Sequence, residues 1–156
     1  QFGGCYNNRG WIYYCTNQYN KAIEDFTKAI DLDNNEKPYS NRALTYLATQ
    51  EYQKAINDLT KVIEINPKDP ISYNFRGFVY LLQKEYDKAI NDFNQAITLN
   101  PKYSEAYYNL GVVYYNKKDY TNAILNLKKS LEIDPNQPEI QKKIQKAEEK
   151  LSHEKK

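Results

Sequence analysis

Residues 107–137 read YYNLGVVYYNKKDYTNAILNLKKSLEIDPNQ, and residues 73–103, YNFRGFVYLLQKEYDKAINDFNQAITLNPKY, follow the same pattern. The dipeptide Ala-Ile marks the register at spacings of 33, 34 and 34 residues: Ala22-Ile23, Ala55-Ile56, Ala89-Ile90 and Ala123-Ile124. A proline recurs in step with it, as Pro67, Pro101 and Pro135. A fixed period of this length is typical of an architecture that repeats one supersecondary unit. Four repeats are therefore predicted, over residues 3–35, 36–69, 70–103 and 104–137.

Each repeat contains two patterns with the period of a helix. Counted from the first residue of a repeat, positions 4, 8 and 11 hold Tyr, a small residue and Tyr, an i, i+4, i+7 stripe: Tyr6-Gly10-Tyr13, Tyr39-Ala43-Tyr46, Tyr73-Gly77-Tyr80 and Tyr107-Gly111-Tyr114. After a polar turn, positions 20, 24 and 27 give a second stripe: Ala22-Phe26-Ala29, Ala55-Leu59-Val62, Ala89-Phe93-Ala96 and Ala123-Leu127-Ser130. Small residues at positions 8 and 20 should let the two helices approach closely. Asn-Pro or Asp-Pro then ends the second helix, except in the first repeat, which has Asn34-Asn35 there.

These repeats resemble the tetratricopeptide repeat, a helix–turn–helix of about 34 residues with the pattern W-x2-L-G-x2-Y…A-x3-F…P. The last repeat matches this pattern with Tyr in place of Trp and Leu in place of Phe: Tyr107, Leu110, Gly111, Tyr114, Ala123, Leu127 and Pro135. The resemblance covers residues 3–137. It implies an all-α fold, a right-handed solenoid of four helix–turn–helix units.

Residues 138–156 resemble the extra helix that often closes such arrays. Their apolar residues form one stripe: Ile140, Ile144, Ala147 and Leu151. A solenoid needs a polar-faced cap at its end. We therefore expect a C-terminal capping helix with a charged tail. No such cap precedes Gly3-Gly4 and the sequence does not begin with Met, which suggests a processed chain or a fragment of a longer array.

Composition and motifs argue against several classes of function. The 22 Lys and Arg nearly balance the 20 Asp and Glu, so neither a nucleic-acid partner nor another polyanion is expected. No apolar run is long enough for a membrane span. Catalytic and metal-binding motifs are absent, and His153 lies in the charged tail. We therefore expect neither an enzyme nor a cofactor. Cys5 and Cys15 lie on one predicted helix, about 15 Å apart, and cannot bond to each other; free thiols favour a cytoplasmic location.

One covariation lies inside the repeats. Position 7 is arginine and position 23 is aspartate in the first three repeats: Arg9 with Asp25, Arg42 with Asp58, and Arg76 with Asp92. In the fourth repeat both change together, to Leu110 and Asn126. Joint loss favours a structural Arg–Asp pair within each hairpin, because an unpaired, partly buried charge is destabilising. The alternative is a set of three basic side chains that bind an acidic ligand.

The opposite face of each first helix is the candidate binding site. Positions 2, 6, 9 and 13 lie about 200° from the packing stripe, and in the family this face lines a concave groove for peptides. With flanking positions, the predicted peptide-binding residues are Asn8, Trp11, Tyr14, Asn41, Leu44, Asn74, Phe75, Phe78, Leu81, Tyr108, Asn109, Val112 and Tyr115. The asparagines would bond a peptide backbone, the exposed apolar residues would anchor it, and the tyrosines of this set appear where packing does not require them.

The resemblance also suggests one specific ligand, which the residues exclude. Family members that bind the acidic tails of chaperones use a carboxylate clamp of basic and Asn side chains. Asn41 fits this clamp, but Asn7, Trp11, Ile71 and Phe75 stand at its other positions, and none is basic. We therefore predict a non-enzymatic module that binds a protein or peptide through apolar anchors. The alternative is a scaffold in which a second copy fills the groove of a homo-oligomer.

Overall fold

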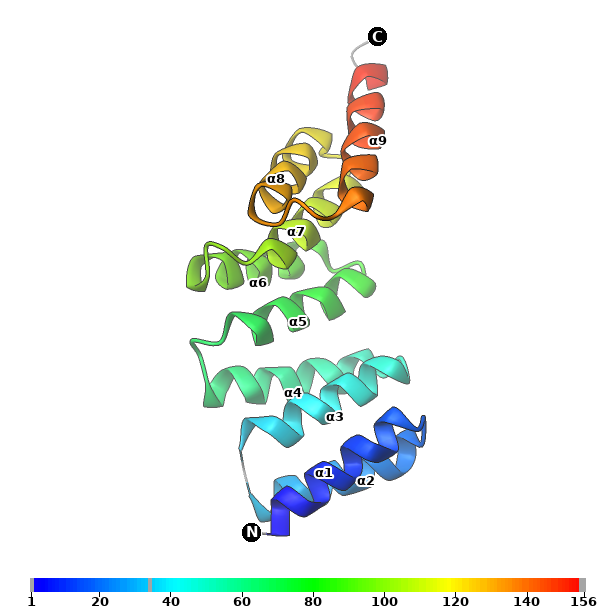
Figure 1. Cartoon of the computed structure of the whole chain (residues 1–156), viewed down its shortest axis with the longest axis vertical. Coiled ribbons are helices and arrows are strands. Elements are labelled where there is room, and N and C mark those ends of the chain that lie inside the picture. The colour runs from blue at the N-terminus through cyan, green and yellow to red at the C-terminus, as the bar shows by residue number, and fades with distance from the viewer. Residues whose placement is uncertain (1, 34, 155–156) are drawn as a thin grey trace. The chain divides into compact units, whose positions relative to one another are not determined.

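The computed structural model describes residues 2–33 and 35–154, and these form only helices and connecting loops (Figure 1). The helices are α1 (Phe2–Cys15), α2 (Tyr19–Leu32), α3 (Glu36–Ala48), α4 (Tyr52–Ile65), α5 (Pro70–Leu82), α6 (Tyr86–Leu99), α7 (Ser104–Asn116), α8 (Tyr120–Ile133) and α9 (Pro138–Glu154). The predicted all-α, helical-repeat fold is confirmed. Asn34, next to the predicted end of the first repeat at residue 35, and the last two lysines of the tail lie outside the described residues. The repeat boundaries stay predictions.

The chain has two compact units, residues 1–79 and 80–156, and the boundary between them falls within α5. In the N-terminal unit, α1 pairs with α2 and α3 pairs with α4. In the C-terminal unit, α7 pairs with α8, and α9 packs on α8. Within the described part of the chain, no helix combines the length and the apolar composition that crossing a bilayer requires.

The turns inside the hairpins share one backbone conformation. Position 15 has a left-handed conformation in every repeat: Asn17, Gln50, Lys84 and Lys118, with φ between 58° and 64°. In the first turn, the N–H of Gln18 donates to the carbonyl of Tyr13 and the N–H of Asn17 donates to that of Tyr14, at 2.8 and 3.0 Å. These two bonds define a Schellman motif, which satisfies the last carbonyls of a helix. The left-handed residue is the middle one of the polar run that each turn contains: TNQ, TQE, QKE and KKD.

Close helix approach at position 8 is confirmed in both units. A Cβ built on Gly10 would lie 2.8 Å from Cε1 of Phe26, and one built on Gly111 would lie 2.8 Å from Cγ of Leu127. Phe26 and Leu127 are buried residues of the second helices. At Gly10 and Gly111 the absence of a Cβ is thus what lets the large residue at position 24 lie directly against the first helix.

Replacing Gly111 by Ala is expected to destabilise the protein. The added methyl would overlap Leu127 and lie 3.2 Å from the carbonyl oxygen of Ala123. Overpacking costs about 1–3 kcal/mol, which exceeds the gain of about 1 kcal/mol from replacing Gly by Ala in a helix. Gly4→Ala is the matched control, because its added methyl has no described atom within 4 Å apart from those of its chain neighbours and its own helix backbone. Urea unfolding should show a loss for Gly111→Ala and a small gain for the control; equal gains would refute the packing argument.

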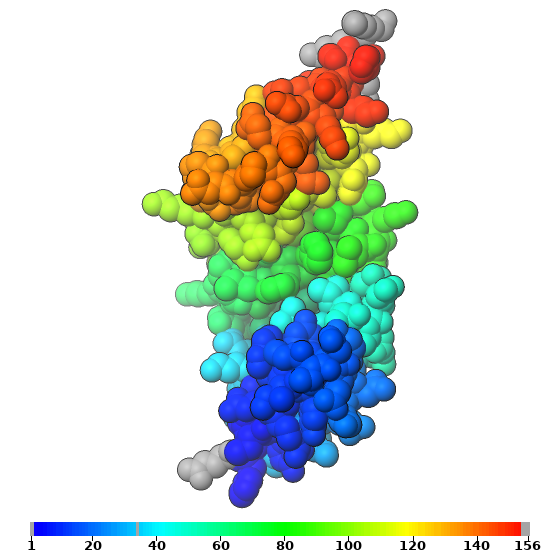
Figure 2. Space-filling model, turned by 45° about the vertical axis from the view of Figure 1, so that its right-hand side comes forward, coloured from blue at the N-terminus to red at the C-terminus, as the bar shows by residue number. Residues whose placement is uncertain are grey.

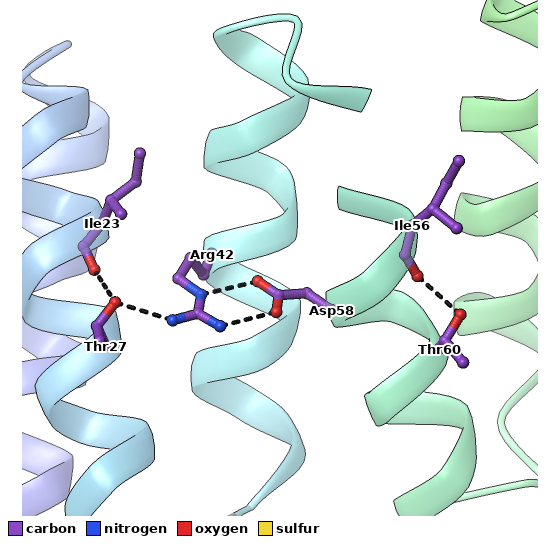
Figure 3. Close-up of polar contacts among 6 residues, drawn as sticks. All are labelled: Ile23, Thr27, Arg42, Ile56, Asp58 and Thr60. Atoms are coloured by element: carbon purple, nitrogen blue, oxygen red, sulfur yellow. Dashed lines mark hydrogen bonds and ion pairs between the residues drawn. The ribbon is translucent and has the colours of Figure 1, made fainter. Parts of the chain in front are cut away.

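The predicted Arg–Asp pairing is confirmed for the two hairpins of the N-terminal unit. Arg42 donates from Nε and Nη2 to the two carboxylate oxygens of Asp58, both at 2.8 Å (Figure 3). Arg9 makes the same bidentate contact with Asp25, at 2.6 and 2.8 Å. These hydrogen bonds, above all other causes, raise the pKa of Arg42 and lower the pKa of Asp25 from their ordinary values. Arg76 and Asp92 belong to different compact units, so the third pair stays a prediction.

The same arginine also connects successive hairpins. Arg42 Nη1 donates to Thr27 Oγ1 of α2 at 2.8 Å, and Thr27 donates to the carbonyl of Ile23 at 2.7 Å (Figure 3). Arg76 donates in the same way to Thr60 of α4, at 3.1 Å. These threonines occupy position 25 of the preceding repeat. Before the fourth repeat, which lacks the arginine, position 25 is Asn94, so the covariation comprises three residues rather than two.

Tyrosines at positions 4 and 11 flank this arginine. The Arg42 guanidinium carbon lies 5.8 Å from the ring centroids of both Tyr39 and Tyr46. Arg9 lies 5.4 and 5.9 Å from the rings of Tyr6 and Tyr13. Cations are attracted to aromatic faces at these distances. In the N-terminal unit these four tyrosines therefore flank the arginines of the two Arg–Asp pairs.

Helix α9 covers the last hairpin, as its apolar stripe predicts. Ile140 and Ile144 form a buried cluster with Leu127 of α8. Tyr108 of α7, together with Ile124 and Leu131 of α8, packs around this cluster. Figure 2 shows the orange-to-red residues of α9 lying over the yellow residues of the hairpin. The outward side of α9 carries exposed charged and amide side chains, as a cap requires.

Candidate peptide-binding site

An apolar pocket opens between α3 and α5 of the N-terminal unit. Its volume is about 90 Å3, and we call it the α3–α5 pocket. It is lined by Ser40, Ala43, Leu44, Leu47, Leu59, Asp69, Ile71, Ser72, Phe75 and Val79. Two of the predicted anchors, Leu44 and Phe75, thus come together here. Their neighbours on the predicted face, Leu47 and Ile71, complete its apolar rim.

Local helix geometry explains why these side chains converge. Leu44 and Leu47 are three residues apart on α3, and Ile71 and Phe75 are four residues apart on α5, so each pair shares one face of its helix. Asp69 fixes the beginning of α5, because its carboxylate accepts from the N–H groups of Ile71 and Ser72, at 3.1 and 3.0 Å. The carboxylate is therefore engaged as a helix cap, and the pocket is chemically apolar.

A second pocket lies between α7 and α9 of the C-terminal unit. This α7–α9 pocket has a volume of about 220 Å3 and is lined by Val112, Tyr115, Asn116, Leu127, Lys143 and Lys146. Val112 and Tyr115 were predicted site residues. The two lysines were not predicted, because the sequence pattern of residues 138–156 assigned their charges only to the water-facing side of a cap. No periodicity signal shows that one edge of a capping helix borders a pocket.

Other predicted residues lie in different surroundings. Trp11 is exposed and stacks on Tyr14 with ring centroids 5.1 Å apart, and Tyr14 in turn lies 5.8 Å from the ring of Tyr19. Asn8 is exposed and lines a separate polar pocket at the start of α1 and α3. Phe78 is half-buried on α5 and is not one of the residues of the α3–α5 pocket. The predicted set is therefore distributed over several places.

Three of the predicted residues are buried. Asn74, Asn109 and Leu81 are only 1%, 5% and 9% exposed, so they offer little surface to a ligand, and their assignment to the groove stays a prediction. The reason for their burial is geometric. These residues lie on the edge of the first helix that packs into the protein. The prediction placed the candidate face about 200° from the packing stripe, and this angle alone does not distinguish the buried edge of that face from its exposed edge.

Three polar or aromatic members of the set, Asn41, Tyr108 and Tyr115, make contacts within the protein. Asn41 Nδ2 donates to Asn7 Oδ1 at 2.9 Å, so this amide joins α3 to α1 instead of pointing only to a ligand. Tyr108 packs against the Leu127 cluster, so the prediction that it is surplus to packing is wrong. Tyr115 lies edge-on to Tyr120, with centroids 5.4 Å apart. These contacts leave the apolar pockets as the features best suited to a ligand.

The described segments, residues 2–33 and 35–154, contain no group of three or more His, Cys, Asp and Glu side chains placed to hold a metal ion. Cys5 and Cys15 are both exposed, and within the described part of the chain neither forms a disulfide bond.

Solved structures of known proteins share this architecture. MamA is 26% identical, with a TM-score of 0.88 over 96% of this chain and 82% of that one. The first TPR of Spaghetti (RPAP3), bound to the HSP90 peptide SRMEEVD, is 24% identical, with a TM-score of 0.73 over 76% of this chain and 94% of that one. YrrB, described as a TPR protein with an unusual peptide-binding site, is 22% identical, with a TM-score of 0.79 over 88% and 72% of the two chains.

Comparison of sequences gives a consistent result. A search of curated proteins found no match. The family model described as tetratricopeptide repeat matches residues 5–36, 37–69 and 104–137, and a second model, described as TPR repeat, matches residues 79–118. With the hairpins, the arginine-centred contacts and these matches together, the chain belongs to the tetratricopeptide repeat family.

Proposed function

We propose that this protein is an interaction module that captures a peptide segment by inserting an apolar side chain into the α3–α5 pocket. The observation that carries the proposal is the convergence of Leu44, Leu47, Ile71 and Phe75 around one opening. Solvent-accessible apolar clusters of this kind usually mark interaction sites. Members of the family act as protein-interaction modules, and two of the similar structures are described with a peptide or a peptide-binding site.

The chemistry of the pocket wall favours an apolar anchor. The polar groups nearby are already engaged: Asp69 caps α5, and the Ser40 hydroxyl donates to the carbonyl of Glu36 at 3.1 Å. A volume of about 90 Å3 admits one side chain. Because none of the described residues that line this pocket is basic, binding should depend weakly on salt. The acidic tails that a carboxylate clamp binds should be poor ligands for it.

The double variant Ile71→Ser/Phe75→Ser is expected to weaken peptide binding by about tenfold or more, because central apolar anchors dominate binding energy. Peptides would first be selected on the wild-type protein from a phage-displayed random library, and their affinities measured by fluorescence anisotropy. Ile65→Ser is the matched control, since Ile65 is an exposed apolar residue on α4 that lies outside the pocket. Circular dichroism would establish that each variant is folded.

Two results would contradict the proposal. Selected peptides without aromatic or aliphatic anchors would remove its chemical basis. Unchanged affinity in a folded Ile71→Ser/Phe75→Ser variant would place the peptide elsewhere. Since Trp11 is the only tryptophan, a change in its fluorescence on titration would report ligands that reach α1.

Self-association is the second candidate, and one observation on α1 favours it. Ile12 is 61% exposed, whereas Thr45, which occupies the same position of the repeat on α3, is 0% exposed. The repeat position that is buried on α3 is therefore occupied on α1 by a large apolar residue that is exposed to water. Light scattering at increasing protein concentration separates the candidates: a dimer that the Ile71→Ser/Phe75→Ser variant converts to a monomer would mean that a second copy occupies the pocket.

A further inference from the structure

We propose that the α7–α9 pocket binds a second kind of peptide element, a large apolar side chain with acidic residues beside it. This inference rests on the proposed function only in that the ligand is a peptide. The two pockets lie in different compact units and differ in chemistry, so each can be tested without the other.

The floor of the α7–α9 pocket suits an apolar side chain. Val112 and Leu127 line it, and the Tyr115 ring, held edge-on to Tyr120, forms one wall. Its volume of about 220 Å3 is more than twice the roughly 90 Å3 of the α3–α5 pocket. An aromatic or long aliphatic side chain would be removed from water there, which is the main source of affinity in such a site.

The rim of the same pocket is basic. Lys143 and Lys146, both exposed, come from α9, and Lys143 Nζ lies 5.8 Å from the ring centroid of Tyr108. Among the described residues, neither lysine forms an ion pair. By contrast, Lys128 of α8 pairs with Glu148 at 3.1 Å. Two uncompensated ammonium groups beside an apolar cavity attract a carboxylate attached to an apolar group.

The spacing of the lysines favours acidic side chains over a single terminal carboxylate. Lys143, Lys146 and Lys150 follow an i, i+3, i+7 stripe of α9, which spans about 10 Å. Lys143 and Lys146 line the pocket and Lys150 lies one helical turn further along α9, so an acidic stretch of peptide can contact more of these ammonium groups than one carboxylate can. Asn116, at the α7 side of the pocket, adds an amide donor and acceptor for the peptide backbone.

The test uses the full chain and four probes. The first is an amidated, fluorescein-labelled peptide with Phe between two Glu residues in a Gly-Ser background. The second replaces each Glu by Gln, the third has the first sequence with a free C-terminus, and the fourth is a vesicle of phosphatidylserine and phosphatidylcholine. The variants are Lys143→Gln/Lys146→Gln and, as a control that removes the same charge from the same unit, Lys128→Gln/Lys129→Gln. All four lysines are exposed, and circular dichroism checks the fold.

The amidated Glu peptide should bind about tenfold more tightly than the Gln peptide, and added salt should weaken its binding. Lys143→Gln/Lys146→Gln should abolish this preference, while the control keeps it. The Ile71→Ser/Phe75→Ser variant should bind the Glu peptide like the wild type, so failure here is distinguishable from failure at the α3–α5 pocket. Equal binding of the Glu and Gln peptides would overturn the inference, as would binding only of the free C-terminus, or lysine-dependent binding of vesicles without binding of peptide.

Discussion

Replacing Arg42 by Leu should lower the free energy of unfolding by about 3–5 kcal/mol, because it leaves the Asp58 carboxylate buried without its partner. Asp58 is 5% exposed, and the side chain of Arg42 is 16% exposed, so water compensates little of the loss. The substitution also removes the hydrogen bond to Thr27 and a cation held between Tyr39 and Tyr46. Urea unfolding followed by circular dichroism measures the effect.

The residues of the fourth repeat suggest a second substitution that should restore the stability lost in Arg42→Leu. Arg42→Leu/Asp58→Asn introduces the residue types of Leu110 and Asn126, and it should recover much of the lost stability, with a coupling of about 1–3 kcal/mol. Arg9→Leu is the comparison, because the side chain of Arg9 is 53% exposed and solvent can replace part of its contact with Asp25. Additive effects of Arg42→Leu and Asp58→Asn would show that the pair is not a stabilising unit and would favour the alternative of an acidic ligand.

Substituting Ile140 and Ile144 together by Ser should cost about 4 kcal/mol or more. Each is buried against Leu127, and removing a large buried aliphatic side chain typically costs 2–5 kcal/mol, on the order of the values measured for cavity formation. A helix that loses its apolar stripe is expected to detach and to leave the last hairpin exposed. The melting temperature should fall, and the variant should aggregate more readily, because a contiguous apolar patch then faces water.

Two comparisons identify the cause. Gln141→Ser/Gln145→Ser changes the same number of residues on the exposed side of α9, so it should leave stability almost unchanged. Ending the chain after Gln137 should reproduce the effect of the isoleucine variant. If the truncated protein melts like the full chain and stays in solution, α9 is an appendage rather than a cap.

The periodicity of the sequence reveals some kinds of contact and not others. Arg42 and Asp58 were paired from covariation alone, because both belong to one hairpin whose register repeats. The role of Thr27 was not predicted, since it depends on which face of the preceding hairpin meets the arginine. Asn41 was predicted to serve a ligand, yet its amide bonds Asn7 of the neighbouring hairpin. The sequence thus predicted contacts within a hairpin, but it did not predict contacts between successive hairpins.

By itself, the sequence determined the helical hairpins, their register, the glycine contacts at position 8 and the capping helix, because each depends on spacing along a short segment of chain. Only the tertiary structure decided that Asn74 and Asn109 are buried, that Leu44 and Phe75 share a pocket, and that Lys143 and Lys146 border another. The physical reason is that a helical period assigns residues to faces of one helix, whereas exposure and pocket shape depend on which other helices cover those faces.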